Sequence, residues 1–167
     1  MTGLGRTFVV LRRLVGRFAG NRRASSAVEF SIIATPFVFA VMGVMQVGIF
    51  YMAQSALDTG MVKTAETLRS NFTTGTTATL LDAGQLKSSV ASSAGAMITN
   101  DATLLVEIRQ LSSLSSATVA IADGNVDYGS AGSTLVLRAQ SSVITLAPGL
   151  GNLNKIYSSA LVRRQGT

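Results

Sequence analysis

Cysteine and histidine are both missing from the 167 residues of this sequence. Without cysteine there are no thiolate nucleophiles or disulfides, and without histidine there is no imidazole for acid–base catalysis or for the usual zinc sites. No paired carboxylates stand out, and the serine-rich stretches lack a neighbouring base. We therefore predict no catalytic residues, no metal site and no cofactor, and an enzyme is the least favoured class of protein.

Acidic residues are absent from the first 23 positions, which contain six arginines and so account for the whole formal charge of +6. The remainder balances eight basic against eight acidic side chains. A nucleic-acid-binding domain is expected to spread basic residues over its folded surface. The neutral remainder therefore argues against a nucleic-acid partner.

A long uncharged stretch follows, because residues 30–57 contain no charged side chain and Phe30–Phe50 is almost wholly apolar. About 20 helical residues cross the hydrocarbon core of a bilayer, so this run is long enough to span one. The apolar region of a removable signal peptide is shorter, which favours a retained anchor that contacts membrane lipid. The alternative, a buried core helix, would need a larger domain around it.

The arginines before the span set the expected topology through the positive-inside rule. We predict a basic cytoplasmic leader at residues 1–24, a transmembrane helix at 25–53 and an exported domain at 54–167. Tyr51 would lie at the outer interface, and Pro36 removes one backbone hydrogen bond within the helix.

The exported part has the pattern of an α+β fold. Apolar residues at three- and four-residue spacing continue the long helix through Leu57, Met61, Ala65, Leu68 and Phe72. Asp82 is a candidate cap for a second helix over 82–98, with Leu86, Val90, Ala94 and Met97 on one face. Four segments rich in Val, Ile, Leu and Thr predict an antiparallel sheet of about four strands: 103–110, 117–122, 134–146 and 156–163. Turns are expected at 123–132 and 148–154.

The junction before the apolar run reads Arg22-Arg23-Ala24-Ser25-Ser26-Ala27-Val28-Glu29-Phe30. Basic residues, a small residue, four uncharged residues and a Glu-Phe pair resemble the processing site of type IV prepilins. Gln46-Val47-Gly48, Gln54-Ser55-Ala56-Leu57-Asp58 and the C-terminal Val162-Arg163-Arg164 extend the similarity to the TadE-like pseudopilins of the tight-adherence (Tad/Flp) systems.

This resemblance implies a pilin-like fold and cleavage by a prepilin peptidase between Ala24 and Ser25, which would make Glu29 the fifth residue of the mature chain. Family members more often have glycine where this chain has Ala24. The implied partners are the peptidase, other Tad pilins or pseudopilins, and assembly-platform proteins. The implied location is the bacterial inner membrane, with a cytoplasmic N-terminus, a periplasmic C-terminal domain and possible association with the pilus.

The sequence leaves two interpretations open for several residues. The resemblance implies that Glu29 pairs with the amino terminus of a neighbouring subunit, whereas the alternative is that it reaches the lipid headgroups. Arg22 and Arg23 are a topology signal in either case. Gln46 is expected to bond to another helix or to its own backbone. For the whole chain, the second hypothesis is a membrane-tethered periplasmic binding module unrelated to pili.

Overall fold

The computed structural model describes residues 22–74, 80–98, 103–113, 119–146 and 154–165, without the side chains of residues 22–25. The chain divides into two compact units, Met1–Val44 and Met45–Thr167. Helix α2, Arg22–Thr73, contributes to both, and it includes Pro36. The predicted leader lies almost entirely outside the described residues.

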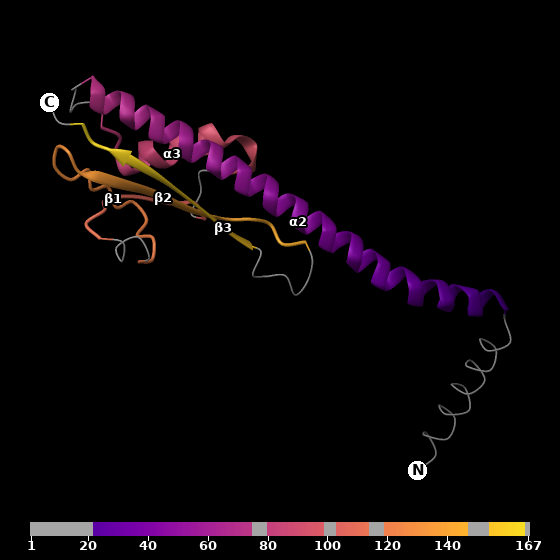
Figure 1. Ribbon diagram of the computed structural model, residues 1–167. Coiled ribbons are helices and arrows are strands. Elements are labelled where there is room, and N and C mark those ends of the chain that lie inside the picture. Colours follow the sequence, from indigo (N-terminus) through magenta and orange to yellow (C-terminus); the bar gives the residue numbers. More distant parts are fainter. Residues whose placement is uncertain (1–21, 75–79, 99–102, 114–118, 147–153, 166–167) are drawn as a thin grey trace, which may run out of the picture. The chain divides into compact units, whose positions relative to one another are not determined.

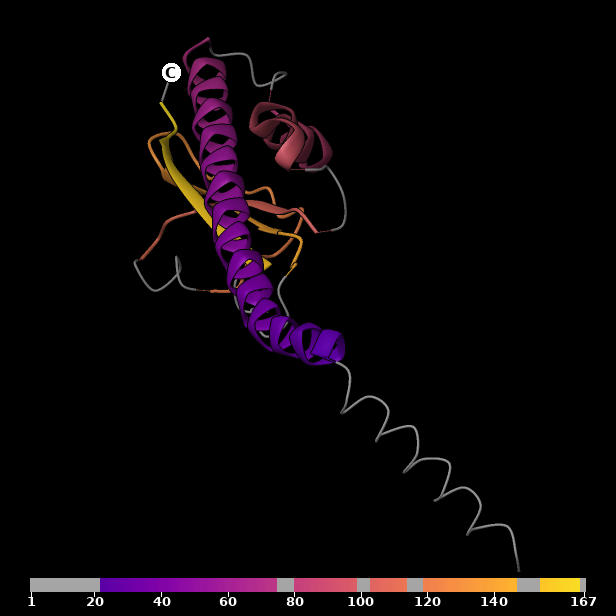
Figure 2. The ribbon, with the colours of Figure 1, turned by 90° about the vertical axis from the view of Figure 1, so that its right-hand side faces the viewer.

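The second unit has an α+β fold, as predicted. Its elements are the later part of α2, helix α3 (Ala83–Ala94), a single 3-10 turn η2 (Gly95–Met97), and three strands. Strands β1 (Leu105–Gln110), β2 (Thr134–Ser142) and β3 (Lys155–Arg163) form an antiparallel sheet in the order β1-β2-β3. Both helices lie on the same face of this sheet (Figures 1 and 2).

The predicted helix periodicity is confirmed by the core. The five residues expected to face inward on α2 are each at most 6 % exposed: Leu57, Met61, Ala65, Leu68 and Phe72. They pack against alternate residues of the strands, including Val106, Ile108, Leu135, Leu137 and Ile156. Alternation along a strand sends every second side chain to the same face, so the other face of the sheet points away from α2.

Asp82 caps α3 as predicted, with a full capping box. Its carboxylate accepts from the Gln85 backbone N–H at 2.7 Å, and the Gln85 side chain accepts from the Asp82 N–H at 3.0 Å. The predicted inner face is only partly right. Leu86 and Val90 are buried, but Met97 is 47 % exposed because the α-helix ends at Ala94 and the turn that follows changes direction.

The sheet has three strands in the described part of the chain, one fewer than predicted. Residues 119–122 of the expected second strand do not join the sheet; the rest of that stretch lies outside the described residues. The neighbouring segment instead runs along the edge of β1, with a single parallel bridge between Ile108 and Val126. The Asp127 N–H donates to the Ile108 carbonyl at 2.9 Å. Edge pairing there is therefore made by irregular backbone.

Tyr128 connects three parts of this unit. Its hydroxyl donates to the Leu81 carbonyl at 2.7 Å, just before α3, and its ring meets that of Phe72 on α2 edge to face at 5.9 Å. Burial, with a smaller contribution from the charge of Asp82, raises the pKa of Tyr128 to about 12 from 10.

This shift predicts a loss of stability at alkaline pH. Because the folded state holds the proton more tightly than the unfolded state, the stabilisation is complete below pH 10 and disappears as the pH rises to about 12. For a half-buried ring the loss should be about 1 kcal/mol. Tyr128→Phe cannot titrate and should cost about 1 kcal/mol near pH 7 through the lost hydrogen bond. Urea unfolding of both proteins should therefore show a difference that narrows between pH 10 and 12. A difference independent of pH would contradict this account.

Candidate functional site

The residues predicted to carry the function begin α2. The stretch from Arg22 to Phe30 is helical throughout, so the peptide bond between Ala24 and Ser25 lies within a helix. Ser25 and Glu29 are four residues apart in the sequence. The side chains of Glu29 and Phe30 are exposed.

Glu29 does not lie at the start of the helix in this chain. The described part of α2 already includes Arg22, so Glu29 is at least seven positions inside the helix. The helix-dipole effect decays within about one turn. The expected stabilisation of the carboxylate by the helix start therefore requires a chain that begins near Ser25.

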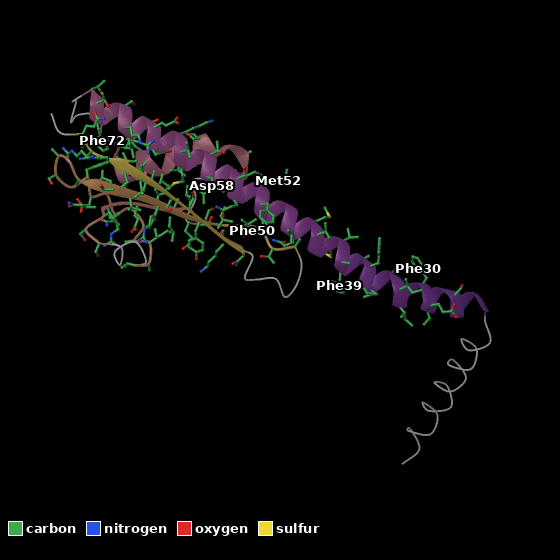
Figure 3. All side chains as sticks on the ribbon, in the orientation of Figure 1. Phe30, Phe39, Phe50, Met52, Asp58 and Phe72 are labelled. Atoms are coloured by element: carbon green, nitrogen blue, oxygen red, sulfur yellow. The ribbon has the colours of Figure 1, made fainter. Side chains whose placement is uncertain are left out.

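The following stretch of α2 exposes large apolar side chains. Phe30, Ile33, Phe37 and Val44 are each more than 65 % exposed. Figure 3 shows Phe30 and Phe39 projecting outward from the helix. Only 6 % of the most apolar 18-residue stretch of α2 is buried. Among the described residues, α2 is the one helix that is long and apolar enough to cross a membrane. So much exposed apolar surface requires a partner or a lipid environment.

Gln46 marks a change in this surface, because it is fully buried. Its side-chain N–H donates to the Ile144 carbonyl at 3.1 Å, and its side-chain oxygen accepts from the Leu146 N–H at 2.6 Å. Gln46 thus bonds to the segment that follows β2. The prediction that it bonds to another helix or to its own backbone is wrong. The sequence could not reveal this contact, since about a hundred residues separate the two partners.

Two more side chains of α2 bond to the backbone of β3. The Gln54 amide donates to the Tyr157 carbonyl at 2.8 Å and to the Asp58 carboxylate at 3.1 Å. Further along the helix, the Arg69 guanidinium donates to the Leu161 carbonyl at 2.7 Å. Because β3 is an edge strand, these bonds satisfy carbonyls that have no neighbouring strand.

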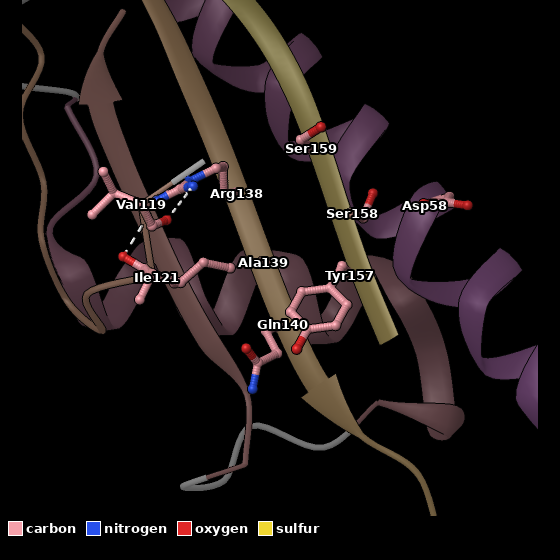
Figure 4. Close-up of a pocket in the computed structure, with 10 residues that line it drawn as sticks. Asp58, Val119, Ile121, Arg138, Ala139, Gln140, Tyr157, Ser158 and Ser159 are labelled. Atoms are coloured by element: carbon pink, nitrogen blue, oxygen red, sulfur yellow. Dashed lines mark hydrogen bonds between the residues drawn. The ribbon is translucent and has the colours of Figure 1, made fainter. Parts of the chain in front are cut away.

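A hollow of about 670 Å³ lies at the sheet, beside β2 and β3. In Figure 4, β3 carries Tyr157, Ser158 and Ser159 and runs between Asp58 and the labelled residues of β2. Its lining is Asp58, Val119, Ala120, Ile121, Arg138, Ala139, Gln140, Tyr157, Ser158 and Ser159.

The positive charge of Arg138, which lines this hollow, is already neutralised by an acidic partner. Arg138 and Glu107 form a buried ion pair across β2 and β1, with the guanidinium Nε at 2.6 Å from the carboxylate. Arg138 also donates to the Val119 carbonyl at 2.6 Å, and the Ala122 N–H donates to Glu107 at 2.7 Å (Figure 4 includes the Arg138 contacts within the hollow). The pair therefore fixes segment 119–122 over the sheet. It leaves the hollow with little to attract an anionic ligand.

Within the described residues, no group of three or more acidic side chains is placed to hold a metal ion. To a membrane-tethered binding module, the hollow beside β3 would offer serine hydroxyls, one tyrosine ring and amide groups. A second hollow of about 640 Å³ lies along α2, where Tyr51, Gln54 and Lys63 are among its lining residues. The exposed start of α2 is thus the more distinctive surface of the chain.

Residues 24–62 match a family model described as TadE-like protein. This part of the chain is similar to the TadE-like family. The match begins at Ala24, the predicted cleavage position, and includes the apolar stretch, Gln46 and Gln54. No curated protein and no solved structure matched the chain.

The match confirms the resemblance to the TadE-like family over these residues and supports a protein associated with a Tad-type pilus. TadE-like proteins are structural pilus components rather than enzymes, and their association is with other components of the pilus. Together with the apolar helix, the match indicates a single-pass membrane protein.

Sequence reasoning did not find the Glu107–Arg138 pair. The available signal was the presence of charged residues within two apolar β-type runs, LVEIRQ and TLVLRAQSS. Such a residue is equally compatible with an exposed strand face, and only the register places Glu107 opposite Arg138.

The buried pair leads to a prediction about stability. Glu107→Gln keeps the shape of the side chain but leaves the Arg138 charge buried without its counter-ion, which should cost about 3–5 kcal/mol. Adding Arg138→Met to that variant should restore part of the loss, because an apolar replacement removes the unpaired charge. The measurement is urea unfolding of the full chain in detergent, followed by circular dichroism.

Lys87→Gln is the matched control for this experiment. Lys87 forms a more exposed ion pair with Asp123 at 3.4 Å, and its loss should cost at most about 1 kcal/mol. Equal effects of Glu107→Gln and Lys87→Gln would show that the buried pair does not hold the sheet and segment 119–122 together.

Proposed function

We propose that this chain is a TadE-like minor pilin or pseudopilin, a structural or assembly component of a Tad-type pilus or secretion apparatus. The observation that carries the proposal is the exposed apolar stretch of α2, preceded directly by the Glu29-Phe30 pair and lying within the family match. The chain acts by packing its membrane helix and its exported unit against other pilus components.

In this proposal the helix spans the bacterial inner membrane within residues 25–53. The six arginines of the leader keep the N-terminus in the cytoplasm, and residues 54–167 are periplasmic. The partners are membrane lipid, a prepilin peptidase, other Tad pilins or pseudopilins, and platform proteins.

Processing is the step that separates this proposal from a binding module. A prepilin peptidase cuts between Ala24 and Ser25, removes the arginine-rich leader and makes the apolar helix the start of the mature chain. The new amino terminus is then four residues from Glu29. The resemblance to type IV prepilins implies a pairing in which the Glu29 carboxylate of one subunit neutralises the amino terminus of another.

We expect the N-terminus of the protein recovered from membranes to be Ser25. Ala24→Lys should block cleavage, because a bulky charged residue does not fit where the family more often has glycine, and the uncut protein should be heavier by its first 24 residues. Ala24→Gly is the positive control and should be cut at least as well as wild type. The readout is intact mass of the membrane-extracted protein. Identical masses for wild type and Ala24→Lys would rule out Ala24 as the processing determinant.

For Glu29, the two interpretations assign its effect to different steps. If the carboxylate pairs with a neighbouring amino terminus, Glu29→Gln should leave export and cleavage intact and abolish assembly, since breaking one side of a buried pair costs about 3–5 kcal/mol. If it reaches only the headgroups, the change should cost about 0.3–1 kcal/mol and pass unnoticed.

The measurement is pilus output or surface adherence alongside the amount of processed protein in the membrane. Glu66→Gln, the same change at an exposed position of the same helix, is the matched control and should behave as wild type. Normal adherence with Gln at position 29 would exclude the pairing. A loss of processed protein would instead assign Glu29 to recognition by the peptidase.

A further inference from the structure

The segment that follows β2, Val143–Leu146, carries two outward-facing apolar side chains. Ile144 is 76 % exposed, the highest value among the large apolar residues described, and Leu146 is 41 % exposed. Positions two apart in extended chain lie on the same side, whereas Val143 packs against the core. Single exposed apolar residues are common, so this pair needs a second observation to carry meaning.

The second observation is how the backbone of this segment is bonded. The fully buried Gln46 amide uses both of its groups here, on the Ile144 carbonyl and the Leu146 N–H. The Val143 N–H donates to the Asn154 carbonyl at 2.7 Å. Backbone groups need such partners where water is scarce, because leaving them unpaired in an apolar medium costs several kcal/mol each. Three backbone groups of the segment thus have partners within the protein, which lowers the cost of placing it where water is scarce.

The third observation is where Gln46 stands along α2. From Ser26 to Met45 the helix advances roughly 30 Å, which is about the thickness of the hydrocarbon core. Gln46 therefore follows directly on a stretch of spanning length. The exposed Tyr51 comes about one and a half turns later, at the depth where aromatic side chains favour the headgroup region. The segment bonded to Gln46 also has no charged residue, since Ser141–Leu146 reads SSVITL.

We propose that Val143–Leu146 is a second membrane contact of the exported unit: Gln46 holds it at the outer boundary of the bilayer, and Ile144 and Leu146 insert among the lipid headgroups and upper acyl chains. This inference rests on the proposed membrane span of α2. The unit then meets the bilayer at two separate points of the chain, the helix itself and the segment after β2.

The absence of tryptophan from the sequence allows a direct test, because a single introduced indole is the only one present. Three variants of the full chain are placed in phosphatidylcholine vesicles whose acyl chains are brominated either near the headgroup or deep in the bilayer. Ile144→Trp reports on the proposed contact. Phe39→Trp reports on the span. Leu161→Trp is the matched control, since it also replaces an outward-facing apolar residue, which is 58 % exposed.

The distance of the control residue Leu161 from the proposed membrane boundary follows from its contact with α2. The Leu161 carbonyl bonds to Arg69, which is about 34 Å further along α2 than Gln46. We expect deep bromines to quench Phe39→Trp, shallow bromines to quench Ile144→Trp, and neither to quench Leu161→Trp.

A fourth variant tests the role of Gln46. Adding Gln46→Leu to Ile144→Trp removes both hydrogen bonds to the segment and should at least halve the quenching by shallow bromines. Gln54→Leu, which removes a bond to the Tyr157 carbonyl instead, is the control and should leave the quenching unchanged. Equal quenching with and without Gln46 would overturn its role in holding the segment.

The experiment distinguishes failure of the proposed membrane span from failure of the proposed second membrane contact. If Phe39→Trp is not quenched at any depth, the membrane span of α2 is wrong and the proposed function fails with it. If Phe39→Trp is quenched but Ile144→Trp behaves as Leu161→Trp does, the span stands and the second contact is overturned. A blue-shifted Ile144→Trp emission without bromine quenching would mean that protein rather than lipid covers the segment, and this too would overturn the proposal.

Discussion

Burial of one apolar stripe of α2 against the sheet is the interaction on which the second unit depends. Leu57, Met61 and Leu68 are each at most 1 % exposed, and the three strands supply the facing side chains. Each such residue contributes about 1.5–3 kcal/mol when moved out of water. A sheet of three strands has too little surface to bury its own apolar face, so it depends on the helix for a core.

The same helix has to suit two environments. Before Val44 its large apolar residues are exposed, and from Gln46 onward they are buried on one side only. The apolar stripe of the second part repeats every three or four residues, which suits one packed face. Exposed apolar side chains such as Phe30, Ile33 and Phe37 line the first part, which suits lipid. One continuous helix therefore combines an apolar stretch that suits lipid with a scaffold for the second unit.

The sequence allowed the helices to be predicted well, because their signals are local. Spacing identified the buried residues of α2, and Asp82 with Gln85 marked the start of α3. The strands were harder, since residues 119–122 have strand composition but lie across the sheet, where the Glu107–Arg138 pair holds them. That pair, and the contact of Gln46 with residues 144 and 146, depend on chain pairings that no local pattern encodes. The site around Ala24 and Glu29 was predicted from its motif alone, and the family match supports the resemblance over residues 24–62.

The bonds from Gln54 and Arg69 to the carbonyls of β3 have a consequence for how subunits can meet. An unprotected edge strand is a template on which a strand from another molecule can add. Here two carbonyls of β3 are already occupied by the scaffold helix, and irregular backbone lines the edge of β1. An incoming strand would have to displace Gln54 and Arg69 first, so the fold discourages growth of the sheet from one molecule into the next and leaves side-chain surfaces as the means of association.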